Sequence, residues 1–111
     1  MAYNLIVTEH ADTLIDSLAG YLAERLHNTD AALHFLDEME SVYARLEENP
    51  FQFPESNDDF LKRRGYREAL LSGMDYRVVF RIEEPQTVYI VGVFHTLENY
   101  RIKVKEPNFM N

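Results

Sequence analysis

Residues 76–95, YRVVFRIEEPQTVYIVGVFH, contain two β-prone segments separated by a proline-containing turn. In the first segment, apolar residues alternate with a more polar set, so each set is expected on one side of a strand. The first set is Tyr76, Val78, Phe80 and Ile82, and the second is Arg77, Val79, Arg81 and Glu83. The second segment, 87–95, is apolar on both sides, which is typical of a central strand. Together the two segments predict a β-hairpin at the centre of a sheet.

The residues before this hairpin predict two helices. Apolar residues recur at helical spacing in 11–26 and again in 31–46, and Pro50 ends the second series. The link between them is short, so the helices are expected to form an antiparallel hairpin. Thr8 is a candidate cap for the first helix.

Strands and loops complete the prediction. Segments 3–8 and 66–71 are β-prone, and 50–59 is predicted as a loop. The tail 97–105 fits either a short strand or a helical turn. The order β-α-α-β-β-β predicts an α+β fold in which the helical hairpin packs on a small, mostly antiparallel sheet.

Composition limits the class of protein. The 111 residues are 46% hydrophobic and 27% charged, as in an ordinary folded domain. Absence of cysteine excludes disulfides and a thiol nucleophile. No Lys or Arg precedes Arg25, which argues against a secretory signal, and the longest apolar run, 88–94, is too short to cross a bilayer. We therefore expect one cytoplasmic domain, residues 1–111, without a membrane partner.

Charge is divided unevenly along the chain. Residues 1–59 hold two of the 11 Lys and Arg and 13 of the 19 Asp and Glu, a net charge of −11, whereas 60–111 sum to +3. Most acidic residues fall on the outer sides of the predicted helices, where charge is usually solvated. The basic residues from Lys62 to Arg81 are expected on adjacent strands. They predict a site for an anionic partner.

Three arginines are the main candidates within this basic stretch. Alternation places Arg77 and Arg81 on one sheet face, and Arg67 lies on the neighbouring predicted strand. Three guanidinium groups converging there could hold a polyanion by bidentate contacts. The basic residues Lys62, Arg63 and Arg64 could extend this surface along a phosphate backbone. Alternatively, Arg77 and Arg81 pair with carboxylates of a helix or face solvent, since arginines on strands commonly pair with acidic residues.

Other candidate groups are few. His95 ends the last predicted strand and is suited to proton transfer near neutral pH, although a structural role is also open. Tyr100 could stack on an unpaired base or act as a packing residue. No second histidine completes a metal site around His34, and no glycine-rich phosphate loop is present, so neither a metal nor a cofactor is expected.

Several segments, in their order and spacing, resemble the RelE/ParE superfamily of bacterial toxins from type II toxin–antitoxin modules. The resemblance covers nearly the whole chain. The segments are the opening Tyr3-x-Leu5-x-Val7-Thr8, the second helix from Ala31-Ala32 to Asn49-Pro50, Gly65-Tyr66-Arg67, Tyr76-Arg77-Val78-Val79-Phe80-Arg81-Ile82, and Val88-x-Ile90-x-x-Val93-x-His95.

The resemblance implies a toxin neutralised by a cognate antitoxin. In mRNA-cleaving members, which act on the ribosome, Arg77 would contact the scissile phosphate, Arg67 would replace a catalytic lysine and His95 would stand near the acid/base position. Lys62, Arg63, Arg64, Arg81 and Tyr100 would then bind RNA. The chain differs from those members at Ala69, the approximate position of a second basic residue. We expect a ribosome-dependent mRNA endoribonuclease, with a gyrase-inhibiting toxin or a non-toxic antitoxin-binding relative as the alternatives.

Overall fold

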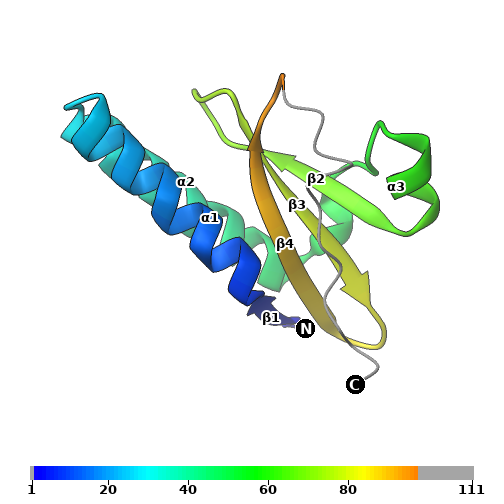
Figure 1. Cartoon of the computed structure of the whole chain (residues 1–111). Coiled ribbons are helices and arrows are strands. Elements are labelled where there is room, and N and C mark those ends of the chain that lie inside the picture. Colours follow the sequence, from blue (N-terminus) through cyan, green and yellow to red (C-terminus); the bar gives the residue numbers. More distant parts are fainter. Residues whose placement is uncertain (1, 98–111) are drawn as a thin grey trace.

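A computed structural model describes residues 2–97 of the chain (Figure 1). The predicted β-α-α-β-β-β order is confirmed, with one further short helix between the second long helix and the second strand. The elements are β1 (Asn4–Val7), α1 (Glu9–Gly20), a π-helical turn (Tyr21–Arg25), α2 (Thr29–Glu48), a 3-10 turn (Pro50–Gln52), α3 (Asp59–Arg63), β2 (Tyr66–Leu70), β3 (Tyr76–Glu83) and β4 (Thr87–His95).

Both long helices begin at side-chain caps. The Thr8 hydroxyl accepts a hydrogen bond from the Ala11 amide at 3.2 Å, and Asn28 accepts one from the Ala31 amide at 3.0 Å. These caps satisfy amide groups that have no partner inside the helix. The first helix, predicted as one continuous segment, changes to a π-helical turn after Gly20.

The four strands form one mixed sheet in the order β1-β4-β3-β2. β1 is parallel to β4, while β2, β3 and β4 form an antiparallel meander. The prediction that 87–95 is a central strand is confirmed, because β4 lies between β1 and β3. Its pairing with β3 is interrupted by a bulge: Val79 is opposite Gly92 and Phe80 opposite Ile90, so Val91 has no counterpart on β3.

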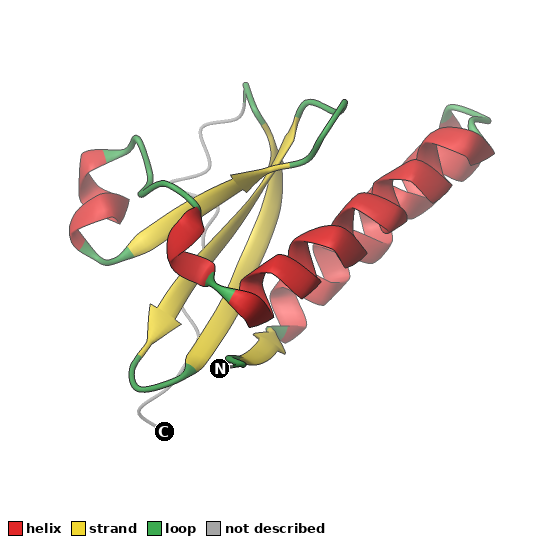
Figure 2. Ribbon diagram, turned by 180° about the vertical axis from the view of Figure 1, so that it is seen from behind, coloured by secondary structure: helices red, strands yellow, loops and turns green. Residues whose placement is uncertain are grey.

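The two faces of the sheet are covered differently (Figures 1 and 2). We call the side packed against α1 and α2 the helix face; its buried strand residues are Ala69, Val78, Phe80, Val88, Ile90 and Val93. The opposite side, the outer face, carries a smaller buried cluster. Its members are Leu61 of α3 with Tyr66, Val79, Val91 and Phe94. The main hydrophobic core therefore lies between the sheet and the helical hairpin.

The short helix α3 corrects the prediction for this part of the chain. Lys62 and Arg63 belong to a helix rather than to a strand. The Asp58 side chain accepts a hydrogen bond from the Leu61 amide at 3.0 Å and so caps α3. Gly65, at φ +86°, lets the chain turn from α3 into β2.

Candidate functional site

Arg77, the first arginine of β3, is held on the outer face by two internal partners. Its Nη1 donates to Glu68 Oε1 at 2.7 Å, and its Nη2 donates to the backbone carbonyl of Thr96 at 2.9 Å. The Arg77 side chain is 16% exposed and that of Glu68 7% exposed. Arg77 therefore pairs with a carboxylate, as one alternative predicted, but the partner comes from the neighbouring strand β2 and not from a helix.

Glu68 connects Arg77 to the segment before α3. Its second oxygen, Oε2, accepts a hydrogen bond from the Ser56 hydroxyl at 3.2 Å, and the amide of Asp58 donates to that hydroxyl at 3.2 Å. We call Ser56, Glu68, Arg77 and Thr96 the Glu68–Arg77 network. It joins the α3 segment, β2, β3 and the residue after β4. Sequence reasoning missed Glu68, although it is the one acidic residue of the strand 66–70.

Arg67 lies on the helix face, so the prediction that Arg67, Arg77 and Arg81 converge on one face is wrong for Arg67. Its cross-strand partner is Phe80, and residues opposite each other in a sheet point to the same side. The Arg67 Nη1 donates to the Phe53 carbonyl at 2.6 Å, and its guanidinium carbon lies 5.2 Å from the centre of the Phe51 ring.

Arg81 shares the outer face with Arg77, as alternation along β3 predicts. Its guanidinium carbon lies 5.8 Å from the centre of the Tyr66 ring, and its Nε lies 3.7 Å from Glu83 Oε2. Val79, fully buried, separates the two arginines along the strand. Each arginine therefore has its own set of contacts within the protein.

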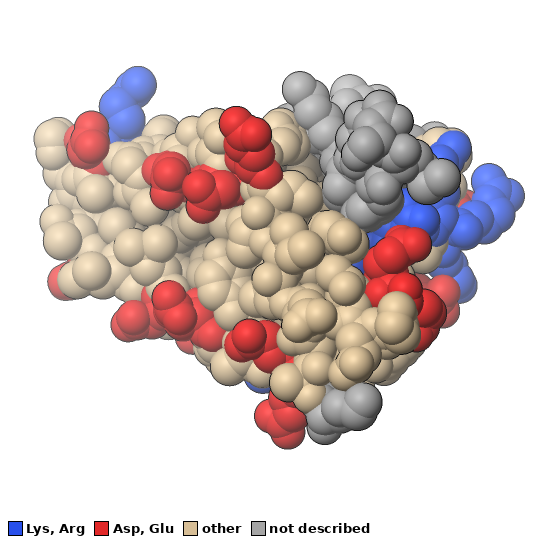
Figure 3. Space-filling view, turned by 90° about the horizontal axis from the view of Figure 1, so that it is seen from below, with Lys and Arg blue, Asp and Glu red and all other residues tan. Residues whose placement is uncertain are grey.

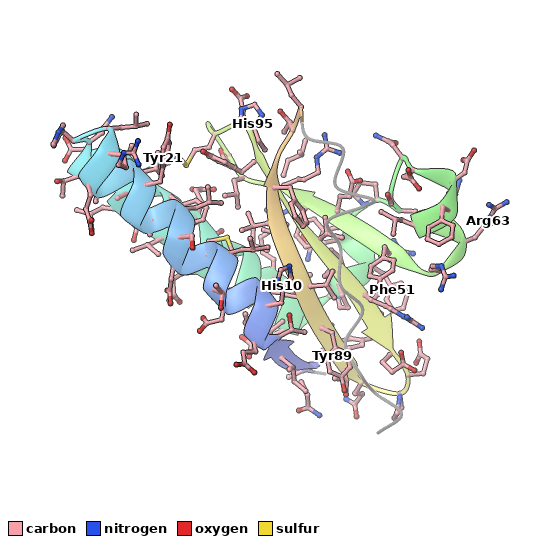
Figure 4. The ribbon with its side chains drawn as sticks, in the orientation of Figure 1. His10, Tyr21, Phe51, Arg63, Tyr89 and His95 are labelled. Atoms are coloured by element: carbon pink, nitrogen blue, oxygen red, sulfur yellow. The ribbon has the colours of Figure 1, made fainter. Side chains whose placement is uncertain are left out.

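His95 ends β4 on the helix face, opposite in direction to Arg77. It is paired with Tyr76, and the two rings meet edge to face with their centres 5.6 Å apart. His95 Nδ1 accepts a hydrogen bond from the Leu97 amide at 3.1 Å. In Figure 4, His95 is seen at the far end of β4 from the β3–β4 turn.

The structure thus does not bring the three predicted catalytic residues together. His95 and Arg67 share the helix face, but their partners on β3, Tyr76 and Phe80, are four positions apart. That spacing corresponds to about 13 Å along the strand. Arg77 lies on the other face. Acid–base catalysis needs its groups within hydrogen-bond reach of one substrate, so joint catalysis would require these three side chains to move toward one another.

The basic residues of α3 lie exposed at one end of the molecule. Lys and Arg side chains gather there, next to Asp and Glu side chains, as Figure 3 shows. The Arg64 guanidinium carbon lies 4.3 Å from the centre of the Phe60 ring. Figure 4 shows Arg63 projecting away from the sheet. Tyr100, the remaining predicted site residue, lies outside the described residues.

Acidic side chains surround the helical hairpin and influence Tyr43. Burial raises the pKa of the Tyr43 hydroxyl from its ordinary value of 10.0, and the nearby carboxylates Asp12, Glu40 and Asp16 raise it further. This environment favours the neutral phenol. The helical hairpin and the α3 end of the molecule therefore differ in their electrostatics.

Within residues 2–97, no group of three His, Cys, Asp or Glu residues is arranged to hold a metal ion. None of the helices described there combines the length and apolar composition needed to span a membrane.

Comparison with known proteins identifies relatives of this architecture. Residues 5–100 match the model of a family described as the ParE toxin of the type II toxin–antitoxin system parDE. The sequence has no match among the curated proteins.

Solved structures from toxin–antitoxin systems have similar folds. A chain of the chromosomal ParDE system from P. aeruginosa is 17% identical, with a TM-score of 0.66 over 85% of this chain and 96% of that one. A chain of the RelBE2 toxin–antitoxin complex from Mycobacterium tuberculosis is 21% identical, with a TM-score of 0.59 over 86% and 99%. A mutant of the E. coli toxin RelE in the free state is 18% identical, with a TM-score of 0.60 over 94% of both chains.

Proposed function

The chain belongs to the ParE toxin family of type II toxin–antitoxin systems, and on that premise we propose that it acts by binding DNA gyrase rather than by cleaving mRNA. A toxin of this kind needs a protein-binding surface and no catalytic residues. A cognate antitoxin is the expected second partner, since the similar chains come from the ParDE system and the RelBE2 complex.

The observation that carries this proposal is the pairing of Arg77 with Glu68. An arginine that stabilises a phosphate in a transition state must direct its N–H groups to the phosphate oxygens. In this chain, Nη1 and Nη2 of Arg77 donate to Glu68 and to the Thr96 carbonyl. A phosphate would have to compete for the Arg77 guanidinium with a carboxylate that is itself buried, and drawing Arg77 away from that carboxylate is costly.

The positions of Arg67 and His95 support the same conclusion. Arg67 is engaged with the Phe53 carbonyl on the helix face, and His95 lies on that face near the other end of β3. An RNA phosphate on the outer face beside Arg77 would meet neither of them. The chemistry expected from the sequence would therefore need a rearrangement of the sheet residues.

The endoribonuclease stays as the competing function, because one observation favours it. Lys62 and Arg63 are exposed cations that could follow an RNA backbone. In that case Arg67, Arg77 and His95 would provide catalysis, while Arg64, Arg81 and Tyr100 would contribute to RNA binding.

Induced expression followed by two assays tests the choice. We expect filamentation with a DNA-damage response, and inhibition of supercoiling when the purified chain is added to gyrase. We expect no cleavage of mRNA on purified ribosomes. His95→Ala should leave gyrase inhibition unchanged, because His95 is assigned no role in it.

Other outcomes of the same assays would overturn the proposal. Rapid translation arrest with mRNA cleavage that His95→Ala abolishes would establish the endoribonuclease. No effect in either assay, together with tight antitoxin binding, would identify a non-toxic relative.

A further inference from the structure

The outward side of α3 carries an apolar ring among cations. Only Leu61 of this five-residue helix is deeply buried, at 2% exposure, where it joins the outer-face cluster. Phe60, in contrast, is 40% exposed. Residues three and four apart on a helix are neighbours, so Phe60 lies next to Arg63 and Arg64. Aromatic residues and arginine are the side chains most enriched at protein interfaces.

This surface is held in place before any partner arrives. Asp58 caps α3, Leu61 anchors it in the outer-face cluster, and Ser56 ties the preceding segment to Glu68. The Arg64 guanidinium lies over the Phe60 ring at 4.3 Å, an arrangement that restricts the direction of its N–H groups. A surface ordered in advance loses less conformational entropy on binding.

Two cations of α3 remain available to a partner. Within residues 2–97, the side chains of Lys62 and Arg63 make no hydrogen bond or ion pair, and both are exposed. The whole chain carries a net charge of −8, so an acidic partner is repelled in general and attracted only where cations cluster. Because of that contrast, an acidic partner would be oriented with its negative charge toward the α3 end.

The carboxylates beside these cations favour a protein partner over a nucleic acid. Glu55 and Asp58 precede α3 and Asp59 begins it, so three carboxylates accompany the three cations at positions 62–64. Figure 3 shows acidic side chains directly beside the basic ones at this end. A continuous phosphate backbone would place negative charge against these carboxylates. A peptide can instead place its carboxylates at Lys62 and Arg63 and an apolar side chain on Phe60.

We propose that the outward side of α3, formed by Phe60, Lys62, Arg63 and Arg64, is a docking site for an acidic segment of the antitoxin that also contains an apolar residue. The proposal rests on membership of the toxin family, not on gyrase as the target. Antitoxin affinity and gyrase inhibition are measured separately, so failure of one leaves the other intact.

The test uses the full chain and the product of the open reading frame adjacent to its gene as the probe. Affinity is measured at several NaCl concentrations for the wild type, Arg63→Glu and Arg25→Glu. Arg25 is the matched control, since it is also exposed and lies in the π-helical turn at the distant tip of the helical hairpin. We expect Arg63→Glu to weaken binding about tenfold and to reduce its salt dependence, and Arg25→Glu to change it less than about twofold.

Two further variants and two further probes complete the experiment. Arg63→Gln, which removes charge without reversing it, should give a smaller loss, and Phe60→Ser should weaken binding with the salt dependence kept. Equal effects of Arg63→Glu and Arg25→Glu, or no binding of the probe by the wild type, would overturn the proposal. The proposal would also be overturned if the α3 variants kept their antitoxin affinity and lost only gyrase inhibition or only binding of a single-stranded oligoribonucleotide.

Discussion

The two faces of the sheet are stabilised by different interactions. The helix face is covered by α1 and α2 and its buried strand residues are apolar, with Phe35 of α2 fully buried against it. The outer face has a smaller apolar cluster, and beside it a buried carboxylate and a guanidinium group are paired at 2.7 Å. Hydrophobic burial stabilises the first face in proportion to area, whereas the second also depends on specific polar partners.

This difference shows why charge on a strand does not by itself indicate a binding site. Arg77 is part of the basic stretch that predicts an anionic ligand, yet its partner is Glu68 of the same protein. Within residues 2–97, two cations that make no ion pair, Lys62 and Arg63, lie on α3, outside the sheet. Three substitutions test the contrast between the faces, beginning with the largest expected effect.

Phe35→Ala tests the helix face. The side chain is fully buried, and its ring meets that of Tyr76 edge to face at 5.8 Å. Removing it leaves a cavity between α2 and the sheet, and we expect the free energy of unfolding to fall by about 3–5 kcal/mol. Denaturant titration measures this change. Leu33→Ala, at a position 56% exposed on the same helix, should change it by less than about 0.5 kcal/mol. Equal losses for the two variants would contradict the assignment of the core.

Glu68→Ala tests the polar part of the outer face. The change leaves the Arg77 guanidinium largely buried without its carboxylate, so we expect the free energy of unfolding to fall by about 2–4 kcal/mol. The control is Glu83→Ala, because Glu83 is 44% exposed and lies 3.7 Å from Arg81; its loss should be below about 1 kcal/mol.

A double variant separates the charge effect from a packing effect. Glu68→Leu combined with Arg77→Met replaces both charges by apolar groups and should recover most of the lost stability. If the double variant is as unstable as Glu68→Ala, the buried charge is not the cause.

Gly92→Ala tests the packing of β4 next to the bulge. A Cβ atom at Gly92 would lie 2.5 Å from ring atoms of Phe94, so the ring would have to move. We expect a loss of about 1–3 kcal/mol in the free energy of unfolding, measured by thermal or denaturant unfolding. In a Phe94→Leu background the same substitution should cost less, since the clashing ring atoms are gone.

Gly20→Ala is the matched control for this substitution. It has no atom within 4 Å of the added Cβ and lies at the end of α1, so it should be neutral or stabilising. A similar loss at both glycines would show that the Phe94 ring is not responsible.

The arrangement of helices and strands was predictable because it follows from local patterns. Apolar residues repeat every 3.6 residues in 11–26 and 31–46, and every two residues in 76–83. These repeats indicate which side of each segment is buried. Thr8 is recognisable as a cap from its residue type and its position before the first helix. Helix α3 escaped prediction because five residues, with Leu61 alone deeply buried, give no period to detect.

The candidate site was predictable only in part, because it depends on which residues of separate strands stand opposite each other. Alternation along one strand correctly places Arg77 and Arg81 on the same face. The direction of Arg67 depends on the pairing of β2 with β3, and a shift of one residue would reverse it. The pairing of Glu68 with Arg77 depends on the same register.

By itself, then, the sequence determined the element order, the α+β class and the family resemblance, since these arise from periodicity and spacing within continuous segments. Only the tertiary structure decided that Arg67 and His95 lie on one face and Arg77 on the other, and that Glu68 pairs with Arg77. The physical reason is that side-chain direction in a sheet follows from register and bulges between strands. Those are properties of non-local hydrogen bonding, which no single segment specifies.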